Sequence, residues 1–208
     1  MKKILALAVI AMFAVSASAQ RGKVASKGAL DNVEFYGHAG LTFASLAGDD
    51  ADDWKSNTGW NLGAEFRKPL KGAWYWGAGI GLQTKGAKMK GSTSDDKVTL
   101  NITTFEVPVN FGYMINLAQG VDLDLHAGAF VDVDMFGKFK VKSGGMSDSS
   151  SMGDWDDFSR LNLGVQAGLG LWFNQIGVNL GYSYGFMQQW EDVEWYPSDF
   201  TVSLLYKF

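Results

Sequence analysis

The sequence predicts an all-β fold, an eight-stranded antiparallel up-and-down transmembrane β-barrel, and three observations lead to that prediction. Apolar and polar residues alternate with a period of two in segment after segment, which is the pattern of a strand with two unlike faces. Short and long connections alternate between these segments. One face of the segments carries almost no charge, whereas the other combines glycine with polar and ionisable residues. Strands that cross a membrane in a closed ring have all three properties.

The first residues have the pattern of a cleavable signal peptide. Residues 1–15 contain two lysines followed by an apolar run, and Ala17-Ser18-Ala19 is a small-residue cleavage site. An uncleaved anchor is disfavoured because the run is shorter than the ~20 residues of a spanning helix and polar sequence follows directly. We therefore expect cleavage between Ala19 and Gln20. The predicted organisation is a signal peptide over 1–19, an N-terminal leader over 20–32 and one β-barrel domain over 33–208.

The composition argues against several classes of function. The chain has no cysteine, which excludes disulfides, thiol chemistry and the lipidated cysteine of a lipoprotein. Its formal net charge is -4, so nucleic acid is not an expected partner, because phosphates need a basic surface. After the signal no segment is apolar enough for a membrane-spanning helix, so any membrane would be crossed by strands.

The alternation predicts eight strands. In residues 121–141, for example, aspartates occupy one face and leucine, alanine and valine the other, so the aspartate face cannot be turned to lipid. An eight-stranded barrel is narrow inside, and glycine on the polar face leaves room for opposing side chains to meet there. The predicted strands cover residues 33–44, 60–68, 74–88, 97–115, 121–141, 160–173, 176–186 and 200–208.

The lengths of the connections give the orientation. Short turns on one side and longer loops on the other are typical of membrane barrels, in which the turns are periplasmic and the loops extracellular. With both termini on the short-turn side, the number of strands must be even. The short connections are residues 69–72, 116–120 and 174–175, the long ones are 46–59, 142–157 and 188–198, and 91–96 is intermediate.

The polarity of the two faces separates a membrane barrel from a soluble ligand-binding barrel. A soluble barrel would turn its apolar face inward around the ligand, whereas here the narrow interior would receive the glycine and charged residues. A charge on a lipid-facing position costs ~2–4 kcal/mol at the membrane centre, so the uncharged face indicates lipid. Aromatic residues near the strand ends form two expected belts: Trp74, Trp76, Tyr113, Phe173, Tyr206 and Phe208 near the turns, and Phe43, Trp60, Tyr184, Phe186 and Phe200 near the loops.

Three motifs make the chain resemble the outer-membrane β-barrel proteins of the porin-like or PorT-like family of Bacteroidetes-type bacteria, and the resemblance covers essentially the whole mature part. They are Ala17-Ser18-Ala19, Phe105-Glu106-Val107-Pro108-Val109 and Tyr206-Lys207-Phe208. The resemblance implies a Gram-negative outer-membrane location, contact with outer-membrane lipid, and a C-terminal signal at Tyr206 and Phe208 that the barrel-insertion machinery reads. Pro108 lacks the N–H of a ladder donor, so we expect a bulge or a distorted pair there.

The polar face supplies the candidate functional residues. Charges inside a narrow barrel are costly unless they are paired, so we expect a plug of mutually paired groups that does not conduct ions. A narrow channel for small solutes is the alternative. The predicted interior network consists of Glu34, His38, Glu65, Arg67, Glu106, His126, Asp132, Asp134 and Arg160, and the same face also carries Asp122, Asp124 and Lys207.

Catalytic and metal sites are not expected. His38 with Glu34 and Ser45 or Ser183 could be drawn as a triad, but no nucleophile motif surrounds either serine. An outer-membrane lipid or peptide hydrolase is therefore the least favoured alternative. The acidic loop clusters 49–53 and 154–157 lack the spacing of a known calcium loop. No cofactor is expected.

The function that we expect is structural or surface-interacting. A monomeric outer-membrane barrel with a filled interior would act through its extracellular loops. The aromatic-acidic runs 190–192 and 194–196 could present Trp and Tyr anchors to a partner. The sequence does not identify that extracellular ligand.

Overall fold

A computed structural model describes residues 32–48, 51, 54–90, 96–143, 146–154, 158–189 and 194–208. The predicted signal peptide and all of the leader except Asn32 lie outside these residues, as does the cleavage site at Ala19 and Gln20. Residues 32–208 form one structural unit. In the described part of the chain, no helix is both long and apolar enough to pass through a membrane.

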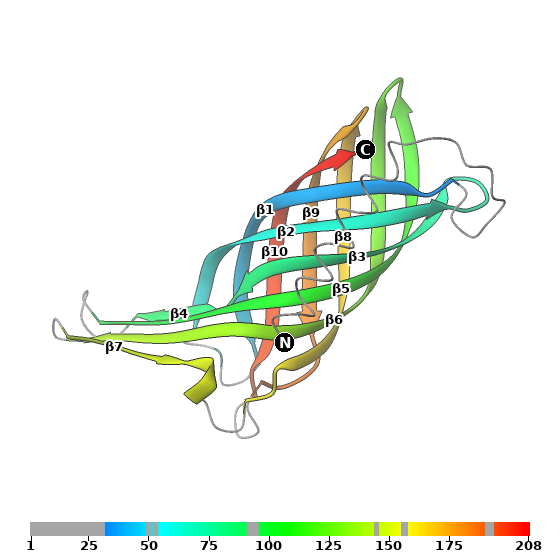
Figure 1. The fold of residues 1–208 in the computed structure, drawn as a ribbon. Coiled ribbons are helices and arrows are strands. Elements are labelled where there is room, and N and C mark those ends of the chain that lie inside the picture. The colour runs from blue at the N-terminus through cyan, green and yellow to red at the C-terminus, as the bar shows by residue number, and fades with distance from the viewer. Residues whose placement is uncertain are drawn as a thin grey trace. The chain divides into compact units, whose positions relative to one another are not determined.

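The described chain consists almost entirely of β-strands (Figure 1). One turn of 3-10 helix, η2 (Met152–Asp154), is the exception among the elements. The strands are β1 (Glu34–Ala47), β2 (Lys55–Pro69), β3 (Trp74–Lys85), β4 (Ala87–Lys90), β5 (Lys97–Ala118), β6 (Val121–Ser143), β7 (Met146–Ser151), β8 (Leu161–Phe173), β9 (Ile176–Gly185) and β10 (Tyr196–Lys207).

Eight of these strands close into an antiparallel ring in the order β1-β2-β3-β5-β6-β8-β9-β10. The ring closes because β1 pairs with β2 on one side and with β10 on the other. Closure leaves no strand edge with unpaired backbone groups, which is the condition for strands in lipid. The predicted eight-stranded up-and-down barrel is therefore confirmed.

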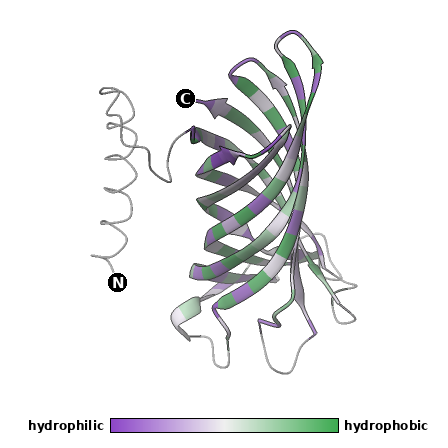
Figure 2. Cartoon of the chain, turned by 90° about the vertical axis from the view of Figure 1, so that its right-hand side faces the viewer, coloured by the Kyte–Doolittle hydropathy of each residue, from purple (hydrophilic) through white to green (hydrophobic). Residues whose placement is uncertain are grey.

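The outer surface of the ring is apolar and the inner surface is polar. Leu62, Val109 and Phe111 are each at least half exposed on the outside, whereas the residues between such positions are turned inward. Figure 2 shows the result as hydrophobic and hydrophilic bands that alternate along the strands. The apolar and polar faces are those that the sequence predicts.

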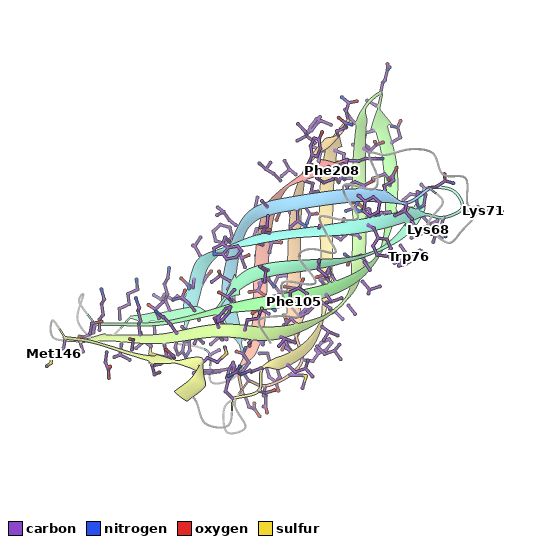
Figure 3. The ribbon with its side chains drawn as sticks, in the orientation of Figure 1. Lys68, Lys71, Trp76, Phe105, Met146 and Phe208 are labelled. Atoms are coloured by element: carbon purple, nitrogen blue, oxygen red, sulfur yellow. The ribbon has the colours of Figure 1, made fainter. Side chains whose placement is uncertain are left out.

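At the short-turn end, aromatic residues gather as expected for a belt. The ring of Trp74 stacks on Phe111 at 5.0 Å and meets Tyr113 edge-on at 4.7 Å. Trp76 lies at the same end of the barrel as Lys68 of β2 and Lys71 of the β2–β3 turn (Figure 3). The tight turns use backbone conformations that favour glycine, with positive φ at Gly72 and Gly120.

At the opposite end, several strands run further than the sequence predicts. β2 begins at Lys55, five residues before its predicted start, and β10 begins at Tyr196, four residues before its predicted start. β4 and β7 continue this extra sheet, with β4 pairing to β2 and β5, and β7 pairing to β6. We call this projecting part, formed by β4, β7 and the loop-side ends of β2, β5 and β6, the extension. Met146 marks its far tip in Figure 3.

The extension has an apolar core of its own. Leu100 and Ile102 of β5 are completely or almost completely buried and pack with Trp54, Ala87 and Met152. The rings of Trp54 and Trp195, from two different loops, meet edge-on at 5.1 Å. Long-range aromatic and aliphatic packing therefore organises the loop side of the molecule.

Pro108 is accommodated without a bulge. On the β6 side it pairs in register with Phe130. On the β3 side, pairing stops at Ala78–Val109 and resumes at Gly81–Glu106 without a change of register. The distortion predicted at Pro108 is thus an interruption of one ladder, which agrees with the missing N–H donor. The register shift in the upper part of β5–β6 lies between Thr103 and Thr104, further toward the loops.

Candidate functional site

The interior of the barrel is filled by large polar and aromatic side chains that lie over glycines of neighbouring strands. A methyl group on Gly177 would be 2.8 Å from the ring of Trp172, and one on Gly63 would be 2.8 Å from Nε2 of His38. Distances below 3.0 Å are not tolerated without a shift. The frequent glycines of the polar face therefore create the space in which side chains from opposite walls meet.

Arg67 is the centre of the ionic cluster nearer the short turns. Its guanidinium donates hydrogen bonds to Glu65 and to Asp124, each at 2.6 Å. Tyr75 donates a hydrogen bond of 2.8 Å to the other oxygen of Asp124. Both Arg67 and Asp124 are buried, so the strong charge-assisted bonds between them offset the cost of removing the charges from water.

Aromatic rings enclose the Arg67 guanidinium from several strands. Its carbon lies 4.5 Å from the centre of the Tyr36 ring, 4.7 Å from Tyr75 and 5.6 Å from Trp172. Tyr36 and Trp172 also meet edge-on at 5.2 Å. Cation–π contacts of this kind strengthen where water is excluded. The cluster of Arg67 with its acids and rings therefore forms a floor across the barrel.

Glu34 extends this floor to the barrel end. It accepts hydrogen bonds from Tyr36 and from Lys207, each at 2.5 Å. Lys207 is about one-third exposed, so the pair joins the buried floor to the solvent side. The pair also ties β1 to β10, the two strands whose contact closes the ring.

Lys85 is the centre of a second cluster, nearer the loops. It is 2 % exposed, and its ammonium group forms an ion pair with Asp132. Asp199 and Glu106 lie 3.8 and 3.9 Å from the same nitrogen. Phe130 covers the group, with its ring centre 4.8 Å from the nitrogen. One lysine thus holds together carboxylates from β5, β6 and β10.

Asp134 lies above this cluster on the same strand as Asp132. It accepts hydrogen bonds of 2.6 Å from Thr104 and 2.8 Å from Gln189. These bonds connect β5 and β6 to the loop that follows β9. The second cluster therefore forms a lid across the barrel on the loop side.

A cavity of about 110 Å³ lies between floor and lid. Its lining includes both histidines of the chain, His38 and His126, and is rich in amides such as Asn110, Gln166 and Asn179. Asn179 Oδ1 is buried there without a hydrogen-bond partner, whereas His126 Nδ1 lies 3.5 Å from the Asp124 carboxylate of the floor. A polar cavity of this size has room for several water molecules.

The structure places the sequence-predicted interior residues as follows. Glu65 and Arg67 meet in the floor, with Glu34 at its edge, while Glu106, Asp132 and Asp134 surround the lid. The two histidines border the cavity. The prediction for Arg160 is wrong, because this residue precedes β8 and its side chain is exposed. Its backbone carbonyl accepts a hydrogen bond from Asp134 instead.

Two charged members of the lid were not recognised from the sequence. Lys85 lies two residues beyond Gln83 on the inward face of β3, so the period-two alternation could have identified it. Asp199 was missed because the last strand was predicted to begin at Phe200, whereas β10 begins four residues earlier, at Tyr196. The inward aromatic residues Tyr36, Tyr75 and Trp172 follow the same alternation, yet their contact with Arg67 depends on three separate strands.

The residues of the hypothetical triad are not assembled. Ser45 donates to the carbonyl of Leu46 at 3.4 Å, and Ser183 donates to Asp199 at 3.4 Å. Within the described residues, no hydrogen bond joins His38 to a serine or a carboxylate, and no group of acidic, histidine or cysteine side chains suits a metal ion. Most of the acidic loop residues in 49–53 and 154–157, and residues 190–193, lie outside the described side chains.

The C-terminal residues are exposed on the barrel wall. Tyr206 and Phe208 meet edge-on at 5.1 Å, and the backbone N–H of Phe208 donates to Phe35 at 3.0 Å. Phe208 therefore continues the closing contact between β10 and β1. Its side chain, labelled in Figure 3, points away from the interior.

Comparison with solved structures finds many barrels of low sequence identity. Ail, the attachment invasion locus protein of Yersinia pestis, is 17% identical, with 84% of this chain and 98% of Ail covered and a TM-score of 0.44. Neisserial surface protein A is 14% identical, with 86% and 100% covered and a TM-score of 0.46. The outer membrane enzyme PagL is 13% identical, with 81% and 98% covered and a TM-score of 0.45.

The comparison with family models is more informative. No curated protein matches the sequence. A family model described as outer membrane protein beta-barrel domain, however, matches residues 18–189. That range covers most of the chain, including all strands of the ring except β10. The chain therefore belongs to the outer membrane protein β-barrel domain family, and its location is the bacterial outer membrane.

Proposed function

We propose that this outer-membrane barrel is a closed, non-conducting carrier of an extracellular interaction surface. The observation that carries the proposal is the pair of buried ionic clusters around Arg67 and Lys85, one on each side of the cavity. Side chains from opposite walls meet in both clusters. A solute would have to break buried, charge-assisted contacts to pass either of them.

The extension supports the second half of the proposal. Its strands and its apolar core around Leu100 and Trp54 make the loop side a built surface rather than a set of short turns. Because long connections of membrane barrels face the outside of the cell, this surface would meet extracellular partners.

Conductance in planar bilayers tests the closed interior. We expect no stable current steps from the purified protein. A variant with Arg67→Ala and Tyr75→Ala removes two members of the floor and should raise the ion leak, which shows that insertion and detection work. Stable, ion-selective currents from the unmodified protein would contradict the proposal.

The narrow channel is retained as a second candidate because of the polar cavity of about 110 Å³. If the cavity belongs to a conduction path, Lys85→Ala should change the ion selectivity of an existing current. If the interior is closed, Lys85→Ala should instead lower the stability of the barrel, with no selective current before or after the change.

Adherence tests the interaction surface. Bacteria that display the protein should bind cultured epithelial monolayers more than bacteria that lack it, and replacing Met146–Ser151 with a short glycine-serine turn should reduce that binding. A barrel that inserts normally, with equal adherence before and after the replacement, would remove the extension from this role.

We further propose that the chain is not an enzyme. The hydrolase alternative rests on His38, which borders the cavity with Ser183. Lipase, deacylase and protease assays should give no activity above background. Activity that His38→Ala abolishes would establish the alternative.

The PorT-like affiliation, the processing and the assembly signal are also proposals. The motifs at residues 17–19, 105–109 and 206–208 support the affiliation.

N-terminal sequencing of the mature protein should begin at Gln20. Replacing Phe208 with Ala should slow assembly by the insertion machinery, as measured by the appearance of heat-modifiable folded barrel. Native mass spectrometry should find a monomer.

A further inference from the structure

Six lysines share one side of the extension, which we call the lysine face. Lys55 pairs with Lys88, Lys88 pairs with Thr99, and Lys97 pairs with Lys142. Paired residues, and residues two apart in one strand, point to the same side of a sheet. Five of the six are exposed and Lys88 is half-buried. The lysine face consists of Lys55, Lys88, Lys97, Lys138, Lys140 and Lys142.

No carboxylate neutralises this face in the described part of the chain. None of the six lysines takes part in an ion pair there. Instead, Lys97 lies directly opposite Lys142, and Lys55 directly opposite Lys88. Like charges in direct cross-strand pairs destabilise a sheet. A net-acidic chain that concentrates lysines in this way has a surface suited to an anionic partner.

The lysine face begins where the lipid-facing surface ends. On β6 the outward residues toward the loops are Val131, Val133 and Phe136, followed by Lys138. Phe136 is 65% exposed. On β5 the outward positions change from Phe105 to Thr103 and then to polar residues up to Lys97. The lysines are thus the next layer above the apolar band, at the level where lipid headgroups lie.

We propose that the lysine face binds the phosphates of an anionic glycolipid in the outer leaflet of the same membrane. Lysine is a point donor for phosphate, and neighbouring positions on a sheet lie ~4.8 Å apart across strands and ~7 Å apart along them. Two phosphates of one headgroup can therefore contact several lysines together. A soluble polyanion has similar charge, but the face is continuous with the lipid-contacting wall, which favours a lipid.

Energy transfer to labelled lipid tests the proposal. Because the chain has no cysteine, Ser149→Cys on β7 provides a single site, opposite Lys140, for attaching the fluorescent donor. The full protein is reconstituted in phosphatidylcholine vesicles that contain increasing fractions of bisphosphorylated lipid A carrying an acceptor. Labelled phosphatidylcholine at the same fractions is the reference.

We expect lipid A to reach half-maximal transfer at a lower mole fraction than the reference lipid, and the preference to weaken as salt is added. Each lysine near an anionic surface contributes about a fivefold preference. K138Q/K142Q should therefore raise the half-maximal fraction of lipid A at least about fivefold. K138R/K142R should keep the preference of the unmodified protein. The charge-matched control K68Q/K71Q, at the opposite end of the barrel (Figure 3), should change it less than about twofold.

Two results would overturn the proposal. One is an unchanged lipid A midpoint in K138Q/K142Q whose heat-modifiable mobility shows a folded barrel. The other is the absence of a lipid preference together with tight binding of soluble polyphosphate that K138Q/K142Q abolishes, which would assign the face to a soluble polyanion.

Discussion

The barrel and the extension share the long strands β5 and β6 but have opposite polarity. In the barrel, β5 turns Val109 outward and Glu106 inward. In the extension, the same strand turns Lys97 outward and Leu100 inward. The surroundings decide the difference, because hydrocarbon accepts apolar side chains and water accepts charged ones. The outward residues of β5 are thus apolar in the lipid-facing part of the strand and polar in the water-facing part.

On β6 the change of polarity depends on one extra residue. Thr103 pairs with Phe136 and Thr104 pairs with Asp134, which leaves Met135 as a bulge. Below the bulge the odd-numbered residues face outward, and above it the even-numbered residues do. The bulge therefore sends Lys138 outward and Phe139 toward the core of the extension.

The largest expected effect comes from removing this extra residue. Deletion of Met135 would turn Lys138, Lys140 and Lys142 toward the apolar core, where unpaired charges cost several kcal/mol each. We expect the extension to lose its packing while the ring below stays folded. Hydrogen exchange should become fast in residues 97–102 and 136–143 and stay slow in β8. Met135→Leu keeps the residue count and should leave the exchange unchanged.

Breaking the floor of the barrel should have the next largest effect. Arg67→Ala leaves Asp124 buried without its cation and should lower the free energy of unfolding by about 3–5 kcal/mol, measured by urea titration in lipid vesicles. Arg67→Lys keeps the charge but loses the fork of donors, so an intermediate loss is expected. Lys71→Ala in the exposed turn is the control and should change the free energy by less than about 0.5 kcal/mol. Equal losses for Arg67→Ala and Lys71→Ala would mean that the floor does not stabilise the fold.

A lysine on the outward face of β5 should destabilise the protein more in the barrel than in the extension. Val109→Lys introduces a charge into the lipid-facing wall and should cost about 2–4 kcal/mol. Thr99→Lys adds a charge to the water-facing part of β5, directly opposite Lys88 and Lys140, and this like-charge contact should cost no more than about 1 kcal/mol. Unfolding titrations of both variants measure the difference. Similar costs would show that the membrane does not end between these two positions.

The smallest expected effect probes the tightness of the barrel interior. Gly177→Ala would bring a methyl group to 2.8 Å from the Trp172 ring, and overpacking of this kind costs about 1–3 kcal/mol. Gly81→Ala is the matched control, since the nearest atom to its methyl group is the Leu62 carbonyl at 3.6 Å. Unfolding titrations should detect a loss for the first variant alone. No loss for Gly177→Ala would indicate an interior with spare room.

Most of the fold could be predicted from local pattern. The assignment of Leu163 outward and Asp132 inward needs only the two-residue period of a strand. The ends of strands were less predictable, because Lys55 and Tyr196 continue sheets whose partners lie far away in the chain. Arg160 was misplaced for the same reason, since the alternation extrapolates past the residue at which β8 begins.

The sequence alone determined that this chain has two unlike faces, one of them suited to lipid, because these properties depend on residues two apart. The alternation of short and long connections gave the even number of strands. Only the tertiary structure decided which inward groups meet. Arg67 pairs with Asp124, which lies 57 positions later in the sequence, and Lys85 pairs with Asp132, which lies 47 positions later. Ring closure brings such residues together, and no periodicity along a single strand encodes the distance across the barrel.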